Sequence, residues 1–273
     1  MDPRLPEPPG SPRLLRARGV GEILVDAFEI YRRHWQNLIA IVAVVVVPLT
    51  ILQVVLVDAF VDQLEVEQLP DGTVRVTGGD LATAIVGGLV VAIVFTLAFM
   101  VLTGAMTRAA AGTFLARDLT IAETYRYGFA RLGSILLVAV LVILAVAAGL
   151  LLFVVPGIIV LTRLWVSMPA LVIEDRRGRE ALRRSWNLVK GYSWPVFGAI
   201  LVSGLLTGLF SSLLAAVFPD NLAGEAIAQT IATILTTPYS VLVGILIYFS
   251  LRVRKEGYGA EDLERDLART AVA

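Results

Sequence analysis

Apolar residues along this chain gather into six long blocks separated by polar segments. The hydrocarbon core of a bilayer is about 30 Å thick, and roughly 20 apolar residues in an α-helix cross it. All but the fourth block reach that length, so they predict transmembrane helices. The blocks are 37–57, 81–105, 135–155, 158–173, 194–218 and 226–251.

The fourth block is short and follows the dipeptide Pro156-Gly157, which predicts a turn. At a rise of 1.5 Å per residue, it spans about 24 Å. Two interpretations stay open for 135–173: two full spans, the second short and tilted, or a re-entrant pair. Both return the chain to the same side of the membrane, and six spans is the preferred prediction.

Three of the polar segments share one helical pattern. In each, large apolar residues recur at relative positions 0, +4 and +7, which lie on one face of an α-helix. Such a helix lies in the headgroup layer, with its arginines toward lipid phosphates. The residues are Leu24, Phe28 and Tyr31 in the first segment, Tyr125, Phe129 and Leu132 in the second, and Leu182, Trp186 and Val189 in the third.

The shared pattern favours an internal repeat. The predicted fold is an all-α integral membrane domain over 19–256, with six transmembrane helices as three hairpins. An amphipathic cytoplasmic interfacial helix precedes each hairpin, so the repeat units cover about 20–119, 120–177 and 178–256. Thr120 and Glu123 fit a capping box at the start of the second helix. The alternative is three unrelated juxtamembrane helices, alike only because such helices are generally amphipathic.

Basic residues indicate the topology. Of the 23 Lys and Arg residues, 21 lie before the first block, in 106–134, in 174–193 and after the last block. Because positive residues favour the cytoplasmic side, both termini are predicted to be cytoplasmic. Arginines outnumber lysines 21 to 2, a bias typical of a GC-rich bacterial genome, so the predicted location is a bacterial plasma membrane.

The predicted outer segment 58–80 is acidic, with Arg75 as its one basic residue. Apolar and polar residues alternate on both sides of Pro70-Asp71-Gly72, which predicts a small β-hairpin in 64–77. A flexible acidic loop is the other interpretation. At the two ends, 1–18 is predicted to be a disordered Pro/Arg-rich cytoplasmic tail, and 257–273 a short cytoplasmic tail.

Composition narrows the chemistry. The chain is 57% hydrophobic and has no net charge, no cysteine and one histidine, His34. Disulfides, thiolate catalysis and Cys-based zinc sites are therefore excluded, and no overall field attracts nucleic acid. The sequence contains no nucleophile–base constellation, phosphate loop or metal-ligand spacing. We therefore predict no catalytic, cofactor-binding or metal-binding residues and no cofactor.

Arg163 is the polar residue that the predicted spans make most conspicuous. A charge inside a membrane marks a functional site by default. Counted from Pro156-Gly157, Arg163 would lie about 9 Å below the outer interface. It would either snorkel to headgroups or to an outer acid, Asp58 or Asp62, or form a polar site. The other candidate residues for that intramembrane polar site are Gln53, Thr236, Thr237 and Tyr239.

Three stretches carry a family resemblance: GEILVDAFEIYRRHW at 21–35, PALVIEDRRGREALRRSWNLVKGYSW at 169–194 and YFSLRVRKEG at 248–257. In this order they resemble a broad group of bacterial six-span membrane proteins, related to the membrane domain fused to some glycerophosphoryl diester phosphodiesterases. The resemblance covers roughly 20–260. It implies a fold and a membrane location but no catalysis, because the phosphodiesterase chemistry of that family belongs to a separate barrel domain.

Two functions follow as hypotheses. The first is a non-enzymatic membrane scaffold or accessory protein that contacts lipid and a protein partner, or a further copy of itself. The alternative is a carrier for a lipid-like or small polar molecule, with a polar cavity near Arg163. An intramembrane enzyme has no catalytic set to support it.

Overall fold

The computed structural model describes residues 16–61, 65–68, 74–77, 81–113, 120–219, 221–259, 261–263 and 265–266. This part of the chain is predominantly helical. Its elements are α1 (Val20–Val61), β1 (Glu65–Gln68), β2 (Val74–Thr77), α2 (Leu81–Thr113), α3 (Ile121–Ala130), α4 (Leu132–Leu152), α5 (Val154–Leu164), α6 (Ser167–Glu174), α7 (Arg179–Val189), α8 (Ser193–Ala215) and α9 (Leu222–Glu256).

In the described part of the chain, six helical segments are long and apolar enough to cross a membrane, which gives the chain the character of an integral membrane protein. Each of the six apolar blocks overlaps one of them, as the sequence predicts. The segments are Val20–Leu56, Ile93–Gly112, Leu132–Leu152, Val154–Glu174, Ser193–Ala215 and Ala223–Glu256.

The first of these segments is bent. His34 has φ −117° and ψ 19°, outside the helical region, so α1 kinks there. The amphipathic residues predicted for an interfacial helix precede the kink, and the apolar block follows it. The sequence predicts two separate helices, but α1 joins them because no proline or glycine interrupts 29–37.

The turn between the third and fourth segments lies at Phe153, and its prediction at Pro156-Gly157 is wrong. Phe153 is extended, with φ −166° and ψ 159°, and α5 begins at the next residue. Pro156 occupies the first turn of α5, where its missing N–H leaves no helical hydrogen bond unmade. Gly157 serves packing: a Cβ on Gly149 would lie 2.9 Å from Gly157 Cα, so α4 and α5 approach closely.

The fourth segment, Val154–Glu174, has 21 residues and is interrupted between α5 and α6. Pro169 causes the break, since its ring would clash with the carbonyl four residues earlier, at Trp165. The hydroxyl of Ser167 donates to the carbonyl of Leu164 at 2.7 Å across the interruption. The segment therefore has the length of a full crossing without being one continuous helix.

Between α1 and α2, the two short strands pair antiparallel, with Val66 opposite Val76. They lie within 64–77, where the alternating pattern predicts a hairpin. The side chains of Asp58 and Asp62, the predicted outer partners of Arg163, lie outside the described residues.

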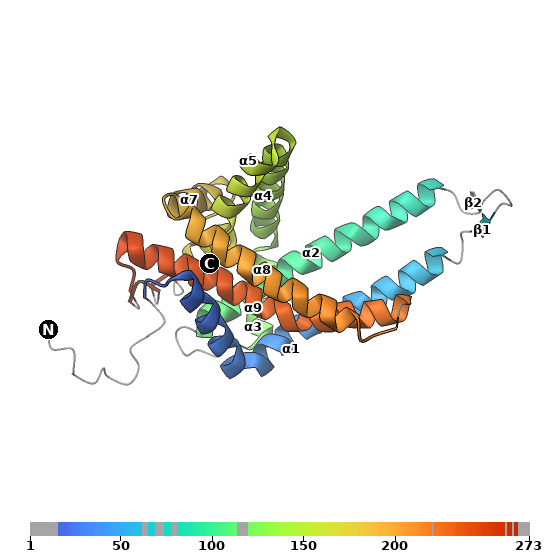
Figure 1. Cartoon of the computed structure of the whole chain (residues 1–273), viewed down its shortest axis with the longest axis horizontal. Coiled ribbons are helices and arrows are strands. Elements are labelled where there is room, and N and C mark those ends of the chain that lie inside the picture. The colour runs from blue at the N-terminus through green and yellow to red at the C-terminus, as the bar shows by residue number, and fades with distance from the viewer. Residues whose placement is uncertain are drawn as a thin grey trace.

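Helix α9 lies at the centre of the helix packing. It packs against α1, α2 and α8, and it also contacts α6 and α7. In Figure 1, α2, α8, α9 and the part of α1 after its kink extend in broadly one direction. The pair α4–α5 projects away from that direction, so the second helix pair is set apart from the other two.

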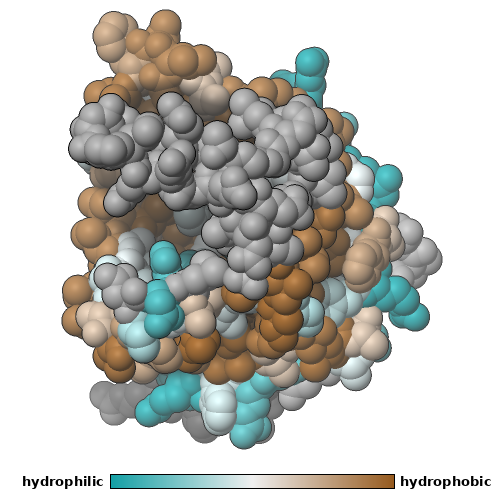
Figure 2. All heavy atoms as spheres, turned by 90° about the vertical axis from the view of Figure 1, so that its right-hand side faces the viewer, coloured by the Kyte–Doolittle hydropathy of each residue, from teal (hydrophilic) through white to brown (hydrophobic). Residues whose placement is uncertain are grey.

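Large apolar side chains cover much of the surface. Leu151 on α4 is 89% exposed, and Leu205 and Leu213 on α8 are 63% and 61% exposed. Figure 2 shows hydrophobic residues over most of the described part of one face. Exposed apolar area of this extent marks a contact with membrane rather than water.

Residues at the inner end of each predicted tail contact the folded domain. Residues 1–15 lie outside the described part of the chain, but Arg18 is buried and its backbone N–H donates to Ser250 Oγ at 2.9 Å. At the other end, Tyr258 and Leu263 are buried in the core. These residues therefore pack against the folded domain, while the tail boundaries at 18 and 257 stay predictions.

In each of the three predicted interfacial helices, the buried residues lie one position before the large apolar residues. Phe28 and Phe129 are 58% and 66% exposed, whereas the small residue before each, Ala27 or Gly128, is buried. A small residue allows close helix contact: a Cβ on Gly128 would lie 2.9 Å from the Val101 carbonyl oxygen. The buried positions are Ile23, Ala27 and Ile30 in α1, Thr124 and Gly128 in α3 with Arg131 directly after it, and Ala181, Ser185 and Leu188 in α7.

Candidate functional site

Arg163 lies against α7. Its guanidinium stacks over the Trp186 ring at 4.6 Å, and the hydroxyl of Ser185 donates to its carbonyl at 2.7 Å. Because the turn is at Phe153, Arg163 is ten residues, or about 15 Å, into the returning segment. The depth of about 9 Å below the outer interface, counted from Pro156-Gly157, stays a prediction. Its Nε is buried without a hydrogen-bond partner among the described residues, so the stacking offsets only part of the cost of burying this charge.

The predicted intramembrane polar site is not assembled. Thr236 and Tyr239 line a cavity together, but Arg163, Gln53 and Thr237 are not among its lining residues. Gln53 is on an exposed face of α1. The Thr236 hydroxyl donates to the Ala232 carbonyl of its own helix at 2.7 Å. Threonine hydroxyls in helices commonly bond in this way, which leaves little polarity for a ligand.

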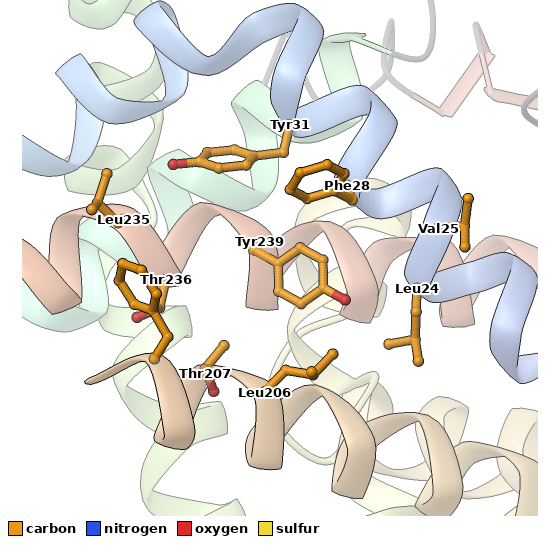
Figure 3. A pocket seen from close by; sticks show the side chains of 10 residues that line it. Leu24, Val25, Phe28, Tyr31, Leu206, Thr207, Leu235, Thr236 and Tyr239 are labelled. Carbon is orange, nitrogen blue, oxygen red and sulfur yellow. The ribbon is translucent and has the colours of Figure 1, made fainter. Parts of the chain in front are cut away.

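The cavity that Thr236 and Tyr239 line is instead apolar. It has a volume of about 540 Å³ and lies between the first part of α1, α8 and α9. In Figure 3 the rings of Phe28, Tyr31 and Tyr239 turn toward the space between these helices. We call it the apolar cavity; its lining residues are Leu24, Val25, Phe28, Tyr31, Leu206, Thr207, Phe210, Leu235, Thr236 and Tyr239.

The apolar cavity brings together two sets of residues that the sequence predicts separately. Leu24, Phe28 and Tyr31 belong to the first predicted interfacial helix, and Thr236 and Tyr239 to the predicted polar site. The kink at His34 makes this possible, because it directs the first part of α1 across α9 and α8. The residues of α8 carried no sequence signal beyond hydrophobicity.

The other two predicted interfacial helices, α3 and α7, contribute no described residue to the apolar cavity. The Tyr125 hydroxyl of α3 donates to the Ile41 carbonyl of α1, and burial raises the pKa of Tyr125 to about 12. Leu132 and Leu182 are half-buried, and Val189 is buried. These positions therefore hold helices together.

A network of charges joins α6, α7, α9 and the residues after α9. Arg184 bonds to Glu174 and Glu256 at 2.8 Å, and Tyr248 OH donates to Glu174 at 2.6 Å. Arg252 bonds to Glu256 at 3.0 Å. We call this set, with Tyr258 and Asp266, the α9 ion cluster.

The α9 ion cluster holds α6, α7 and the end of α9 together. Burial would lower the pKa of Arg184, but its bonds to Glu256 and Glu174 outweigh burial and raise it. Burial raises the pKa of Tyr258 well above its usual value, and the nearby Asp266 adds to this. Within the described residues, no three His, Cys, Asp or Glu side chains gather closely enough to hold a metal ion. The carboxylates of the cluster instead neutralise arginines.

Comparison with protein-family models, with curated proteins and with solved structures found no match to this chain. The family resemblance of 21–35, 169–194 and 248–257 therefore stays a prediction. Function has to be argued from the site alone.

Proposed function

We propose that this chain is a non-enzymatic integral membrane protein that binds lipid, and that it holds an acyl chain in the apolar cavity. The carrying observation is the cavity itself: about 540 Å³ of space lined almost wholly by apolar side chains, on helices with membrane-spanning character. Ligand cavities in proteins commonly have volumes of about 300–1,000 Å³.

The polarity of the lining favours an acyl chain over a small polar molecule. The hydroxyls of Thr207 and Thr236 both donate to carbonyls of their own helices, at 3.0 and 2.7 Å. A polar solute would lose its hydration there without gaining partners. Tyr31 and Tyr239 add two hydroxyls, and a tyrosine with one end apolar and one end wet suits the ester region of a lipid.

The surroundings of the cavity favour a lipid that enters from the side. Neighbouring residues of α8, Leu205 and Leu209, are 63% and 60% exposed, so the cavity opens beside an apolar surface. In a bilayer this surface faces acyl chains, and one chain can enter the cavity without crossing water.

Three hairpins with both termini in the cytoplasm of a bacterium remain our proposed arrangement. The packing of α1 on α2, α4 on α5 and α8 on α9 supports it. The common register of Ala27, Gly128 and Ser185, each the buried small residue of its helix, supports an internal repeat. As an accessory or scaffold protein, the chain would present bound lipid to a protein partner or to a second copy of itself. This role is expected from the sequence alone.

The test uses the full-length protein in bilayers that contain phosphatidylcholine with a photoreactive group in one acyl chain. Cross-links should concentrate on the cavity residues of α1, α8 and α9. Thr207→Trp fills the cavity and should reduce these cross-links about tenfold, since overpacking costs about 1–3 kcal/mol. Leu205→Trp, on the exposed face of the same helix, is the matched control. Equal labelling of the two variants would reject the proposal.

A further inference from the structure

A second, smaller cavity of about 250 Å³ lies where the same three helices begin or end. It is bounded by the start of α1, the start of α8 and the last turns of α9. We call it the arginine cavity and define it by Arg18, Ile23, Tyr192, Val196, Ser250 and Arg254.

Arg18 is the unusual residue of this cavity. Its side chain is 0% exposed, and its Nη2 is buried without a hydrogen-bond partner among the described residues. Its Nε donates to Asp26 at 2.6 Å, and its Nη1 to the Arg16 carbonyl at 3.3 Å. A guanidinium has five donors, and a buried donor left unpaired is costly. The free donor therefore calls for an acceptor that the described residues do not supply.

Arg254 brings a second guanidinium to the same cavity. It donates to the Arg18 carbonyl at 2.8 Å and stacks over the Tyr192 ring at 5.7 Å, while its side chain stays exposed. Ser250 accepts from the Arg18 N–H, and its own hydroxyl donates to the Arg18 carbonyl at 3.3 Å. These bonds fix Arg18 and Arg254 on one wall.

The charge balance around the cavity favours an anion. Among the described residues, two arginines and no acid line it, and Asp26 offsets the charge of one of them, Arg18. The nearest acids have partners: Asp26 binds Arg18, and Glu22 accepts from the Gly19 N–H and pairs with Arg16. Lys255 adds positive charge nearby.

Helix ends add to this field. The amino termini of α1 and α8 border the cavity, and a helix amino terminus attracts anions. The carboxyl end of α9 opposes them, but its last turn carries Arg254 and Lys255. The balance stays positive.

We propose that the arginine cavity binds a phosphate group, and that the lipid of the apolar cavity is therefore anionic. The lipid half of this inference rests on the proposed function, whereas the phosphate site does not. Arg254, whose side chain is exposed, supplies charge-assisted donors to the phosphate oxygens, a task for which guanidinium geometry is well suited. Arg18 Nη2 is enclosed in this structure, so it becomes a second donor only when its side chain turns toward the bound phosphate.

The spacing of the two cavities fits one lipid molecule. Ser250 and Tyr239 are 11 residues apart on α9, or about 16 Å along the helix. Half of a bilayer's hydrocarbon core is about 15 Å. A phosphate held at Arg18 and Arg254 can therefore place its acyl chain between Leu206 and Tyr239.

The experiment measures apparent Kd values of the detergent-purified, full-length chain by native mass spectrometry. The probes are phosphatidic acid, diacylglycerol with the same acyl chains, and inorganic phosphate as competitor. The wild-type chain should prefer phosphatidic acid by about tenfold or more, the value of one charge-assisted contact. Arg254→Gln should remove most of that preference, and Arg18→Gln should do the same.

The matched control is Arg33→Gln, which removes the same charge from an exposed side chain of α1 paired with Glu29. If Arg18→Gln does not fold, Arg254→Gln decides alone, because that side chain is exposed. Competition by inorganic phosphate would support a soluble phosphate as a ligand, and its absence would support the lipid headgroup.

Equal Kd values for phosphatidic acid and diacylglycerol, or equal effects of Arg254→Gln and Arg33→Gln, would overturn the phosphate site. Thr207→Trp separates the two proposals. If it leaves binding of both lipids unchanged while the preference for phosphatidic acid persists, the acyl-chain site fails and the phosphate site stands.

Discussion

The apolar cavity and the arginine cavity lie on the same three helices, yet their chemistry is opposite. In the apolar cavity, threonine hydroxyls are taken up by their own helices. In the arginine cavity, a buried guanidinium retains a free donor. Position along the helices explains the difference: mid-helix positions offer no unpaired backbone groups, whereas helix ends offer free N–H groups and tolerate charge.

The comparison also shows why one molecule can occupy both. An amphiphile needs an apolar site and a polar site at a fixed spacing. Helix α9 sets that spacing, because Tyr239 lines one cavity and Ser250 the other. Three further substitutions can break or sharpen this contrast.

The largest effect is expected from Glu174→Ala, which should destabilise the end of α9 beside the arginine cavity and leave the apolar cavity in place. Glu174 binds Arg184 and Tyr248, and its side chain is 6% exposed. Loss of one partner in a buried ion pair costs about 3–5 kcal/mol, and the partly exposed Arg184 places this case at the low end. Thermal unfolding should report the loss.

The end of α9 carries Arg254, so Glu174→Ala should also weaken phosphatidic acid binding more than diacylglycerol binding. Glu180→Gln is the control, since the Glu180 side chain is 71% exposed. A variant with unchanged phosphate preference would show that the α9 ion cluster does not support the arginine cavity.

A smaller effect is expected from Arg163→Leu, because Arg163 lines neither cavity. It should lose its stacking on Trp186, at a cost of about 1 kcal/mol, and keep both lipid affinities. Trp186→Leu should cost a similar amount, and the double variant should be less destabilised than the sum. A selective fall in lipid affinity for Arg163→Leu would return this residue to the binding site.

The smallest effect is expected at α3, which contacts neither cavity. Bonds from the Thr120 N–H and hydroxyl lower the pKa of Glu123 below its ordinary 4.5. The stabilisation is therefore complete above pH 4.5 and is lost as the pH falls through the lowered value.

Thr120→Ala should lower the melting temperature by about 2 °C at neutral pH and by less in acid. Melting curves of both proteins across this pH range provide the check. A difference that grows on acidification would contradict the capping-box account.

Hydrophobic blocks and caps were predictable because they are local. A run of apolar residues favours a membrane helix wherever it occurs, and the Thr120–Glu123 box forms within one helical turn. The turn before α5 was mislocated because Pro156 is equally compatible with a turn and with the first turn of a helix.

The large apolar positions of the three short helices did not reveal which face packs against the neighbouring helices. Size and hydrophobicity marked Phe28 and Phe129, but the neighbouring helix packs against Ala27 and Gly128. Close approach of two helices requires small residues at the contact, so Ala27 and Gly128 are buried while Phe28 and Phe129 stay exposed.

The sequence alone determined which segments can cross a membrane, where the charges gather and which chemistries are excluded, because these follow from composition and short-range pattern. Only the tertiary structure decided that Arg18 meets Ser250, 232 residues away, and that Leu24 meets Leu206 across one cavity. Contacts between distant segments depend on how kinked helices pack. No local pattern encodes that packing, and both cavities are its product.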